Sequence, residues 1–157
     1  RRVVASPEPK SVLQLETIKS IVESGVITIA LGGGGIPVTK NNEGRIIGKE
    51  AVIDKDRSSA LLANDLDVDL FVISTDADQA YLNYKTADEE GIRKSDIKMM
   101  KKYSEEGHFA PGSMGPKIES AIKFIENGGK RAIITSYEYL MDALEEKAGT
   151  HILKEIV

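Results

Sequence analysis

The chain has 157 residues, 41% of them apolar and 29% charged, and its 21 Lys and Arg against 25 Asp and Glu give a formal net charge of −4. The length suits one domain of roughly 100–200 residues, and the composition excludes a disordered chain. The absence of cysteine excludes disulfides and thiolate metal sites, and the acidic balance argues against a nucleic-acid or membrane-surface partner.

The spacing of apolar residues, together with the glycines and prolines between them, predicts helices that alternate with strands. In chain order, the predicted elements are a helix over 12–24, a strand over 26–31, a hairpin of 36–40 and 45–48, a helix over 56–66, a strand over 70–74, an extended piece over 80–84, a helix over 96–106, a helix from 116, a strand over 131–135, a helix over 138–147 and a strand over 150–153.

Three local signals accompany these elements. Ser11 and Ser95 stand where an N-cap is expected, and Pro116 fits the first position of a helix. The continuous apolar run 26–31, rich in β-branched residues, is typical of a strand buried on both faces.

The alternation of strands and helices predicts an α/β sandwich around a mainly parallel sheet. Ligands of such sheets bind beyond the carboxyl ends of the strands. This rule singles out three loops for a functional site, at residues 32–38, 75–81 and 108–117.

A run of glycines, Gly32 to Gly35, follows the predicted strand 26–31. Glycines at this place allow backbone N–H groups to approach an anion closely. The spacing matches neither the dinucleotide-binding fingerprint nor a Walker A loop. A flexible hinge or a tight crossover explains the run as well as an anion site does, so both interpretations stay open.

Lys55 lies between Asp54 and Asp56 at the start of a predicted helix. In phosphoryl transfer, a lysine neutralises charge on the transferred group while a carboxylate orients cations or a metal. Taken alone, Asp56 would more simply be an N-cap. Close to a glycine loop, the Asp-Lys-Asp segment is a candidate for catalysis.

The segment 111–117 offers backbone donors at Gly112 and Ser113 and the positive end of the helix that follows. Lys117 adds a full positive charge in the first turn of that helix, where a cation is unfavourable by about 0.3–1 kcal/mol. An anionic ligand would offset this cost, which favours a functional role over a purely structural one.

The segment 75–81 follows a predicted strand. A Thr75-Asp76 pair at a strand end commonly begins a turn, which is the simpler interpretation. In a nucleotide site, Tyr81 would stack on a base and Asp76 would accept a hydrogen bond from a sugar or an amine. His108 and His151 are too far apart in the sequence to predict a zinc site, and we expect no metal ligands.

With these segments in view, the sequence resembles the carbamate kinases of the amino acid kinase family. The matching stretches run in the family's order: RRVVASPEPK, IALGGGGIPV, EAVIDKDRSSALLA, STDADQAYLNY, FAPGSMGPKIESAIKF and GGKRAIITS. One departure lies at 77–80, where Ala-Asp-Gln-Ala replaces the Val-Asp-Gly-Val common in the family. The resemblance covers the family's C-terminal half. We therefore expect residues 1–157 to form a C-terminal nucleotide-binding lobe, with the N-terminal acceptor lobe absent.

The resemblance implies a three-layer αβα sandwich of the amino acid kinase fold and reversible phosphoryl transfer between ATP and carbamate. It implies ATP or ADP with Mg²⁺, carbamate or carbamoyl phosphate as substrate, and no nucleic-acid or membrane partner. It also implies a homodimer for the intact protein and a cytoplasmic enzyme of arginine metabolism.

The resemblance also implies roles for individual residues. Lys55 would contact nucleotide or phosphoryl oxygens, Asp56 would organise the site lysines, and Lys117 would neutralise charge at the β/γ bridge. The remaining residues fall into three groups: Thr75, Asp76 and Tyr81 would line the nucleoside, Gly112, Ser113 and Met114 would flank the adenine and phosphates, and Gly33, Gly34 and Gly35 would face the transferred group.

Two other hypotheses stay open. Another amino acid kinase, acting on acetylglutamate or UMP, is less well supported because the Asp-Lys-Asp and GSMGPK segments favour a carbamate kinase. A nucleotide-binding lobe without turnover of its own is the third hypothesis, since much of the acceptor pocket belongs to the family's N-terminal half.

Overall fold

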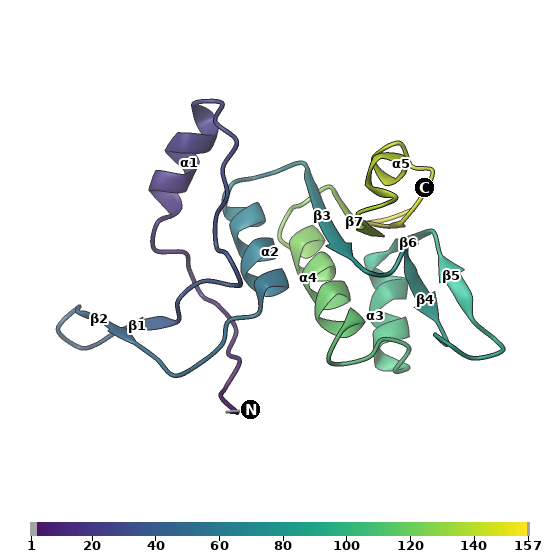
Figure 1. Cartoon of the computed structure of the whole chain (residues 1–157), viewed down its shortest axis with the longest axis horizontal. Coiled ribbons are helices and arrows are strands. Elements are labelled where there is room, and N and C mark those ends of the chain that lie inside the picture. Colours follow the sequence, from purple (N-terminus) through teal and green to yellow (C-terminus); the bar gives the residue numbers. More distant parts are fainter. Residues whose placement is uncertain (1–2, 157) are drawn as a thin grey trace. The chain divides into compact units, whose positions relative to one another are not determined.

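A computed structural model describes residues 3–156 and divides the chain into two units, Arg1–Leu66 and Asp67–Val157. The second unit is built on a four-stranded sheet (Figure 1). Its strands lie in the order β3 (Leu70–Thr75), β7 (Arg131–Ser136), β8 (Thr150–Leu153) and β6 (Lys94–Asp96). The pairs β3–β7 and β6–β8 are parallel and the pair β7–β8 is antiparallel, which confirms the predicted mainly parallel sheet.

Helices cover both faces of this sheet. They are α3 (Ile97–Glu105), α4 (Met114–Glu126) and α5 (Leu140–Leu144). On one face Phe124 of α4 packs on Phe71 of β3, with ring centroids 5.3 Å apart. On the other, Ala143 of α5 packs with Ile133, and Val72 packs against them. Because neighbouring residues of a strand point to opposite faces, α4 and α5 lie on opposite sides, and the unit has the predicted three layers.

A hairpin of β4 (Ala80–Leu82) and β5 (Glu90–Ile92) completes the second unit. Thr150 of β8 joins this hairpin to the central sheet. The backbone N–H of Ala80 donates to Thr150 Oγ1 at 2.8 Å, and the same hydroxyl donates to the carbonyl of Ile92. The start of the hairpin is thereby held beside the sheet.

The first unit contains α1 (Leu15–Glu23), β1 (Val38–Lys40), β2 (Ile46–Gly48) and α2 (Lys55–Asp65). The predicted hairpin is confirmed, because β1 and β2 pair antiparallel. The Asn41 side chain closes its turn by accepting from the backbone N–H groups of Glu43 at 3.0 Å and Arg45 at 2.9 Å.

The predicted strand 26–31 is wrong for this structure. These residues pair with no other segment among residues 3–156, and the side chains of Ile27 and Ile29 are both 96% exposed. A β-branched run acquires strand geometry from hydrogen-bonded neighbours. None of the described segments supplies a neighbour here.

Helix starts differ from the expected positions. The first helix begins at Leu15, so Ser11 is not its N-cap. Ser95 lies in β6, and Asp96 caps α3 by accepting from the N–H of Met99 at 2.8 Å. Helix α4 begins at Met114, which makes Pro116 its third residue. Proline is tolerated there because the first four helical N–H groups need no intrahelical partner.

Short elements account for the other differences. The pattern predicts neither β5 nor β6, since each strand has three residues and β6 is Lys-Ser-Asp. The expected helix 138–147 is reduced to α5. Within residues 3–156, no helix has the length and apolar character that crossing a bilayer requires.

Candidate functional site

A cavity of about 570 Å³ lies at the carboxyl end of β3 in the second unit. Thr75, the last residue of β3, pairs with Ser136 of the parallel strand β7, so the cavity lies at the sheet edge where the topology predicts a ligand. Six predicted residues line it: Thr75, Asp76, Tyr81, Ser113, Met114 and Lys117. Gly112, which was also predicted, is exposed and lies outside the lining.

Two aromatic rings form part of the cavity wall. The rings of Tyr81 and Tyr84 have centroids 5.8 Å apart and an interplanar angle of 35°. The Tyr81 hydroxyl donates to the Asp78 carboxylate at 2.7 Å. Burial raises the pKa of Tyr81, Asp78 raises it further, and a hydrogen bond with Gln79 partly offsets this rise. Tyr81 is therefore a protonated donor at neutral pH, with its hydroxyl already committed.

Positive charge also lines the cavity. Lys117 is half-buried in the first turn of α4, and the α4 N-terminus carries the partial positive charge of the helix dipole. Ser113 is the N-cap residue but makes no side-chain capping bond. Gly115 lies close to the preceding loop, since a Cβ there would be 3.1 Å from the Ala110 carbonyl oxygen. This arrangement suits an anionic ligand that also carries a planar group.

His108 and its neighbours form a third part of the cavity wall. The loop 108–117 is among those expected at the site, but His108 itself is considered from the sequence only as a zinc ligand. The backbone N–H of Asn83 donates to His108 Nδ1 at 3.3 Å, and His108 Nε2 lies 3.5 Å from the Glu106 carboxylate. Nδ1 is thus the acceptor and Nε2 carries the proton. These contacts join the loop after β4 to the loop before α4. The available signal was the rule that places ligands beyond strand ends, which already selects the loop 108–117.

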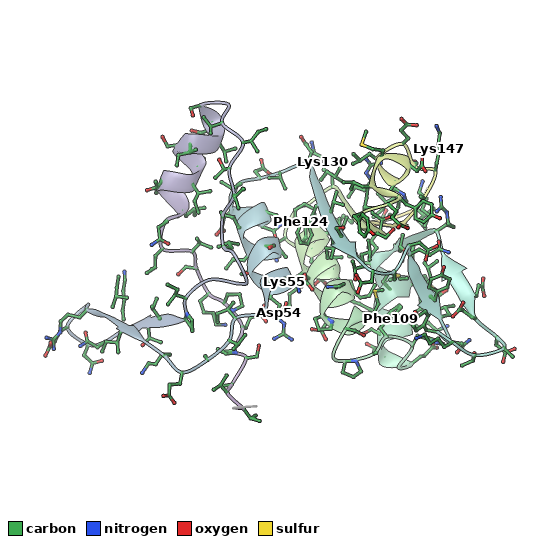
Figure 2. All side chains as sticks on the ribbon, viewed as in Figure 1. Asp54, Lys55, Phe109, Phe124, Lys130 and Lys147 are labelled. Carbon is green, nitrogen blue, oxygen red and sulfur yellow. The ribbon has the colours of Figure 1, made fainter. Side chains whose placement is uncertain are left out.

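Lys55 and Asp56 belong to the first unit. Figure 2 shows Asp54 and Lys55 where α2 begins. Asp54 is the N-cap, and its carboxylate accepts from the backbone N–H groups of Asp56 at 2.9 Å and Arg57 at 3.1 Å. The simpler interpretation of Asp56 as the N-cap is therefore wrong. Asp56 is only 7% exposed, which is unusual for a carboxylate.

The glycine run lies against the start of α2 within the first unit. Gly34 is buried with φ of +129°, and a Cβ there would be 2.0 Å from the Ile53 carbonyl oxygen and 3.3 Å from the Lys55 nitrogen. A side chain is excluded at this position by both backbone conformation and space. Gly34 and Gly35 also line a cavity of about 560 Å³ in this unit, while Gly33 does not.

The predicted catalytic residues therefore form two sets, with Lys55 and Asp56 in the first unit and Lys117 in the second. Among residues 3–156, no three His, Asp or Glu side chains gather closely enough to hold a metal ion.

Comparisons with known proteins agree on one family. The model of the amino acid kinase family matches residues 2–136. The chain is 52% identical over 153 residues to the carbamate kinase of Pyrococcus furiosus, covering 98% of this chain and 48% of that protein. It is 45% identical over 154 residues to the carbamate kinase-like protein YahI of Escherichia coli, covering 98% and 49%.

A solved structure of a carbamate kinase has the same fold as this chain. The carbamate kinase from Giardia lamblia bound to AMP-PNP superposes with a TM-score of 0.93 at 41% identity, covering 96% of this chain and 47% of that one. The expected fold is thereby confirmed. The chain spans about half the length of the curated relatives it matches.

Proposed function

The chain belongs to the amino acid kinase family, and we propose that it is the C-terminal, nucleotide-binding part of a carbamate kinase. The intact enzyme would transfer a phosphoryl group reversibly between ATP and carbamate, forming ADP and carbamoyl phosphate. One observation carries the proposal. Residues predicted from two separate segments, 75–81 and 113–117, line a single cavity that combines aromatic rings with positive charge.

The nucleoside would occupy the end of the cavity lined by the two tyrosines. A purine ring stacks favourably on an aromatic face, and Tyr81 and Tyr84 both line the cavity. Thr75 and Asp76 would contact the sugar, and Ser113 and Met114 would lie along the path from adenine to phosphate, with Gly112 flanking them. The phosphates would extend toward Lys117 and the α4 N-terminus, where their charge is stabilised.

The residues that the resemblance assigns to the transferred group belong to the first unit. Lys55 is the first residue of α2 and lies between the N-cap Asp54 and the buried Asp56. It would contact phosphoryl oxygens, the buried Asp56 would organise the site lysines, and Gly33, Gly34 and Gly35 would face the moving group. Catalysis would then depend on positioning and charge neutralisation, with no covalent enzyme intermediate.

Mg²⁺ would accompany the nucleotide and neutralise phosphate charge. Kinase-bound Mg²⁺ is commonly held by one or two carboxylates together with phosphate oxygens and water. Since no three carboxylate or imidazole groups gather among the described residues, phosphate and water would supply most of its ligands. The carboxylates next to Lys55 in the sequence are those of Asp54, which caps α2, and Asp56.

The remaining parts of the proposal concern the intact protein. Because relatives are about twice as long, we propose that an N-terminal acceptor lobe supplies much of the carbamate pocket and that this chain alone does not turn over. A homodimer, a cytoplasmic location and a role in arginine or agmatine breakdown belong to the same proposal and rest on the family resemblance.

Two measurements test the proposal. Isothermal calorimetry with Mg-ADP should show saturable binding to the folded chain, and folded protein that releases no heat would refute the nucleotide site. A coupled assay of ATP formation from carbamoyl phosphate should show negligible turnover by this chain and turnover only when an N-terminal half is supplied. Robust turnover by the 157-residue chain would refute the proposal that activity requires an N-terminal acceptor lobe.

A further inference from the structure

His108 is fixed at the C-terminal end of α3. The helix is followed by Gly107 at φ of +82°, whose backbone N–H donates to the Ser104 carbonyl at 3.1 Å. The N–H of His108 donates to the Tyr103 carbonyl at 3.1 Å, and the two rings meet edge-on with centroids 5.9 Å apart. This pair of backbone bonds with a side-chain contact is the Schellman motif of a helix end. The end of α3 therefore orients the His108 ring.

The turn after β4 carries Tyr84, which lines the cavity and is 55% exposed. Asn83 and Lys85 on either side of it have φ of +50° and +62°, a region that non-glycine residues seldom adopt. The Thr86 N–H and hydroxyl both donate to the Asn83 carbonyl, at 3.0 and 2.8 Å. The Lys85 N–H donates to the Glu89 carboxylate at 2.6 Å. Because much of Tyr84 is exposed, its place on the wall depends on this hydrogen-bonded turn.

A hydrogen bond connects this turn to the end of α3. The backbone N–H of Asn83 donates to His108 Nδ1 at 3.3 Å, across 25 residues of sequence. Nδ1 accepts only in the neutral ring with its proton on Nε2, and Nε2 lies 3.5 Å from the Glu106 carboxylate. Asn83, Tyr84, Glu106 and His108 all line the cavity. The protonation state of His108 is thus coupled to the turn that carries Tyr84.

We propose that neutral His108 is a positioning residue for nucleotide binding: it holds the Asn83 backbone, and through it the Tyr84 ring, in place on the cavity wall. The inference rests on the proposed function, since it takes an adenine nucleotide as the ligand of this cavity. A ring that is already in place loses less conformational freedom when the ligand binds, so affinity is gained by preorganisation. Acid converts His108 to an imidazolium, in which both nitrogens donate, so the bond from Asn83 is lost and affinity falls.

The charge of the imidazolium would act in the opposite direction. In contact with the ring are Tyr103 and Glu106, and Glu106 is also paired with Lys102 at 3.8 Å. The other titratable groups on the cavity wall are Asp76, Tyr81, Tyr84 and Lys117. A positive charge at His108 would attract the phosphates of the ligand and tighten binding. The sign of the pH dependence therefore separates positioning from simple electrostatic attraction.

The pH dependence of Mg-ADP binding tests the inference. Calorimetry between about pH 8 and pH 5, where histidine titrates, gives Kd for the wild type, His108→Asn and His108→Leu. Asn places an oxygen acceptor where Nδ1 lies and does not titrate, so titration of the ligand itself cancels in the comparison with the wild type.

At the alkaline end His108→Leu should raise Kd roughly three- to tenfold, the contribution of one neutral hydrogen bond, and His108→Asn should raise it less. In acid the wild type should approach His108→Leu, while His108→Asn binds more tightly than either. A wild type that stays level with His108→Asn as the pH falls, or gains affinity relative to it, would overturn the inference. This comparison decides the matter even if His108→Leu fails to fold.

Two further variants locate the effect. In a Tyr84→Ala background, His108→Leu should cause no further rise in Kd, because the ring that His108 positions is gone; multiplying effects would count against the inference. His151→Gln is the matched control, since His151 is the other histidine of the chain and does not line the cavity. It should keep the loss of affinity in acid, and disappearance of that loss would overturn the role of His108. Wild-type protein that binds no Mg-ADP at any pH would overturn the proposed function together with this role, whereas wild-type binding with the pH dependence of His108→Asn would overturn the inference alone.

Discussion

Replacing Lys117 by Met should weaken nucleotide binding and stabilise the chain at the same time. Lys117 is half-buried, lines the cavity and lies in the first turn of α4. A hydrogen bond to a charged group contributes about 1.5–3 kcal/mol, which corresponds to a roughly 10–150-fold rise in the Kd for Mg-ADP. The same change removes a cation from a helix N-terminus, which should raise the free energy of unfolding by about 0.3–1 kcal/mol.

Lys123→Met is the matched control. Lys123 lies in the last turn of the same helix, is also half-buried, and does not line the cavity. Removing a cation from this end should lower the free energy of unfolding and leave the affinity for Mg-ADP within about twofold, because the dipole favours cations at a helix C-terminus. Calorimetry measures the Kd for Mg-ADP, and urea denaturation measures the free energy of unfolding. Equal affinity losses in the two variants would refute the argument, because net charge alone would then explain the effect.

Three further predictions concern stability. Gly34→Ala should lower the free energy of unfolding, measured by urea denaturation, by at least about 2 kcal/mol, because its Cβ would lie 2.0 Å from the Ile53 carbonyl oxygen. Gly33→Ala should leave the free energy of unfolding nearly unchanged, and similar losses in the two variants would refute the packing argument. Asp54→Ala should cost about 0.5–2 kcal/mol through loss of the N-cap, measured in the same way, and an unchanged stability would contradict the capping role. Burial lowers the pKa of His151, so the unfolded chain binds the proton more readily, and the free energy of unfolding should fall as pH drops below about 6.5. A His151→Gln variant whose thermal midpoint changes with pH in the same way as that of the wild type would refute this.

The sequence predicts the layers and the position of the cavity, because both depend on local signals. The apolar strand 70–74 and the turn residues after it are adjacent in the chain, and parallel topology then places Thr75 at the ligand-binding edge. Lys117 is predicted because it contradicts the electrostatic preference of a helix start. Such contradictions are visible without a structure.

Other features depend on contacts between distant segments and were missed or misjudged. Strand pairing of residues 26–31 needs a neighbour that no local pattern guarantees, and the described chain supplies none. The cavity role of His108 follows from its bond to Asn83, which is 25 residues away. The caps at Asp54 and Asp96 differ from the expected Asp56 and Ser95 by two positions and one, because Asp and Ser residues close together in the sequence are nearly equivalent capping groups.

The unpaired run 26–31, in which Val26, Ile27 and Ile29 are exposed, affects how the chain behaves at high concentration. Its sequence, Val-Ile-Thr-Ile-Ala-Leu, contains no charge and no proline to discourage intermolecular pairing. Ile27 and Ile29 are almost fully accessible, so copies of the run could stack as cross-β strands. Aggregation would then begin from the folded chain and need no prior unfolding. Soluble yield should therefore depend on chain concentration and chaperone capacity more than on the melting temperature of the second unit.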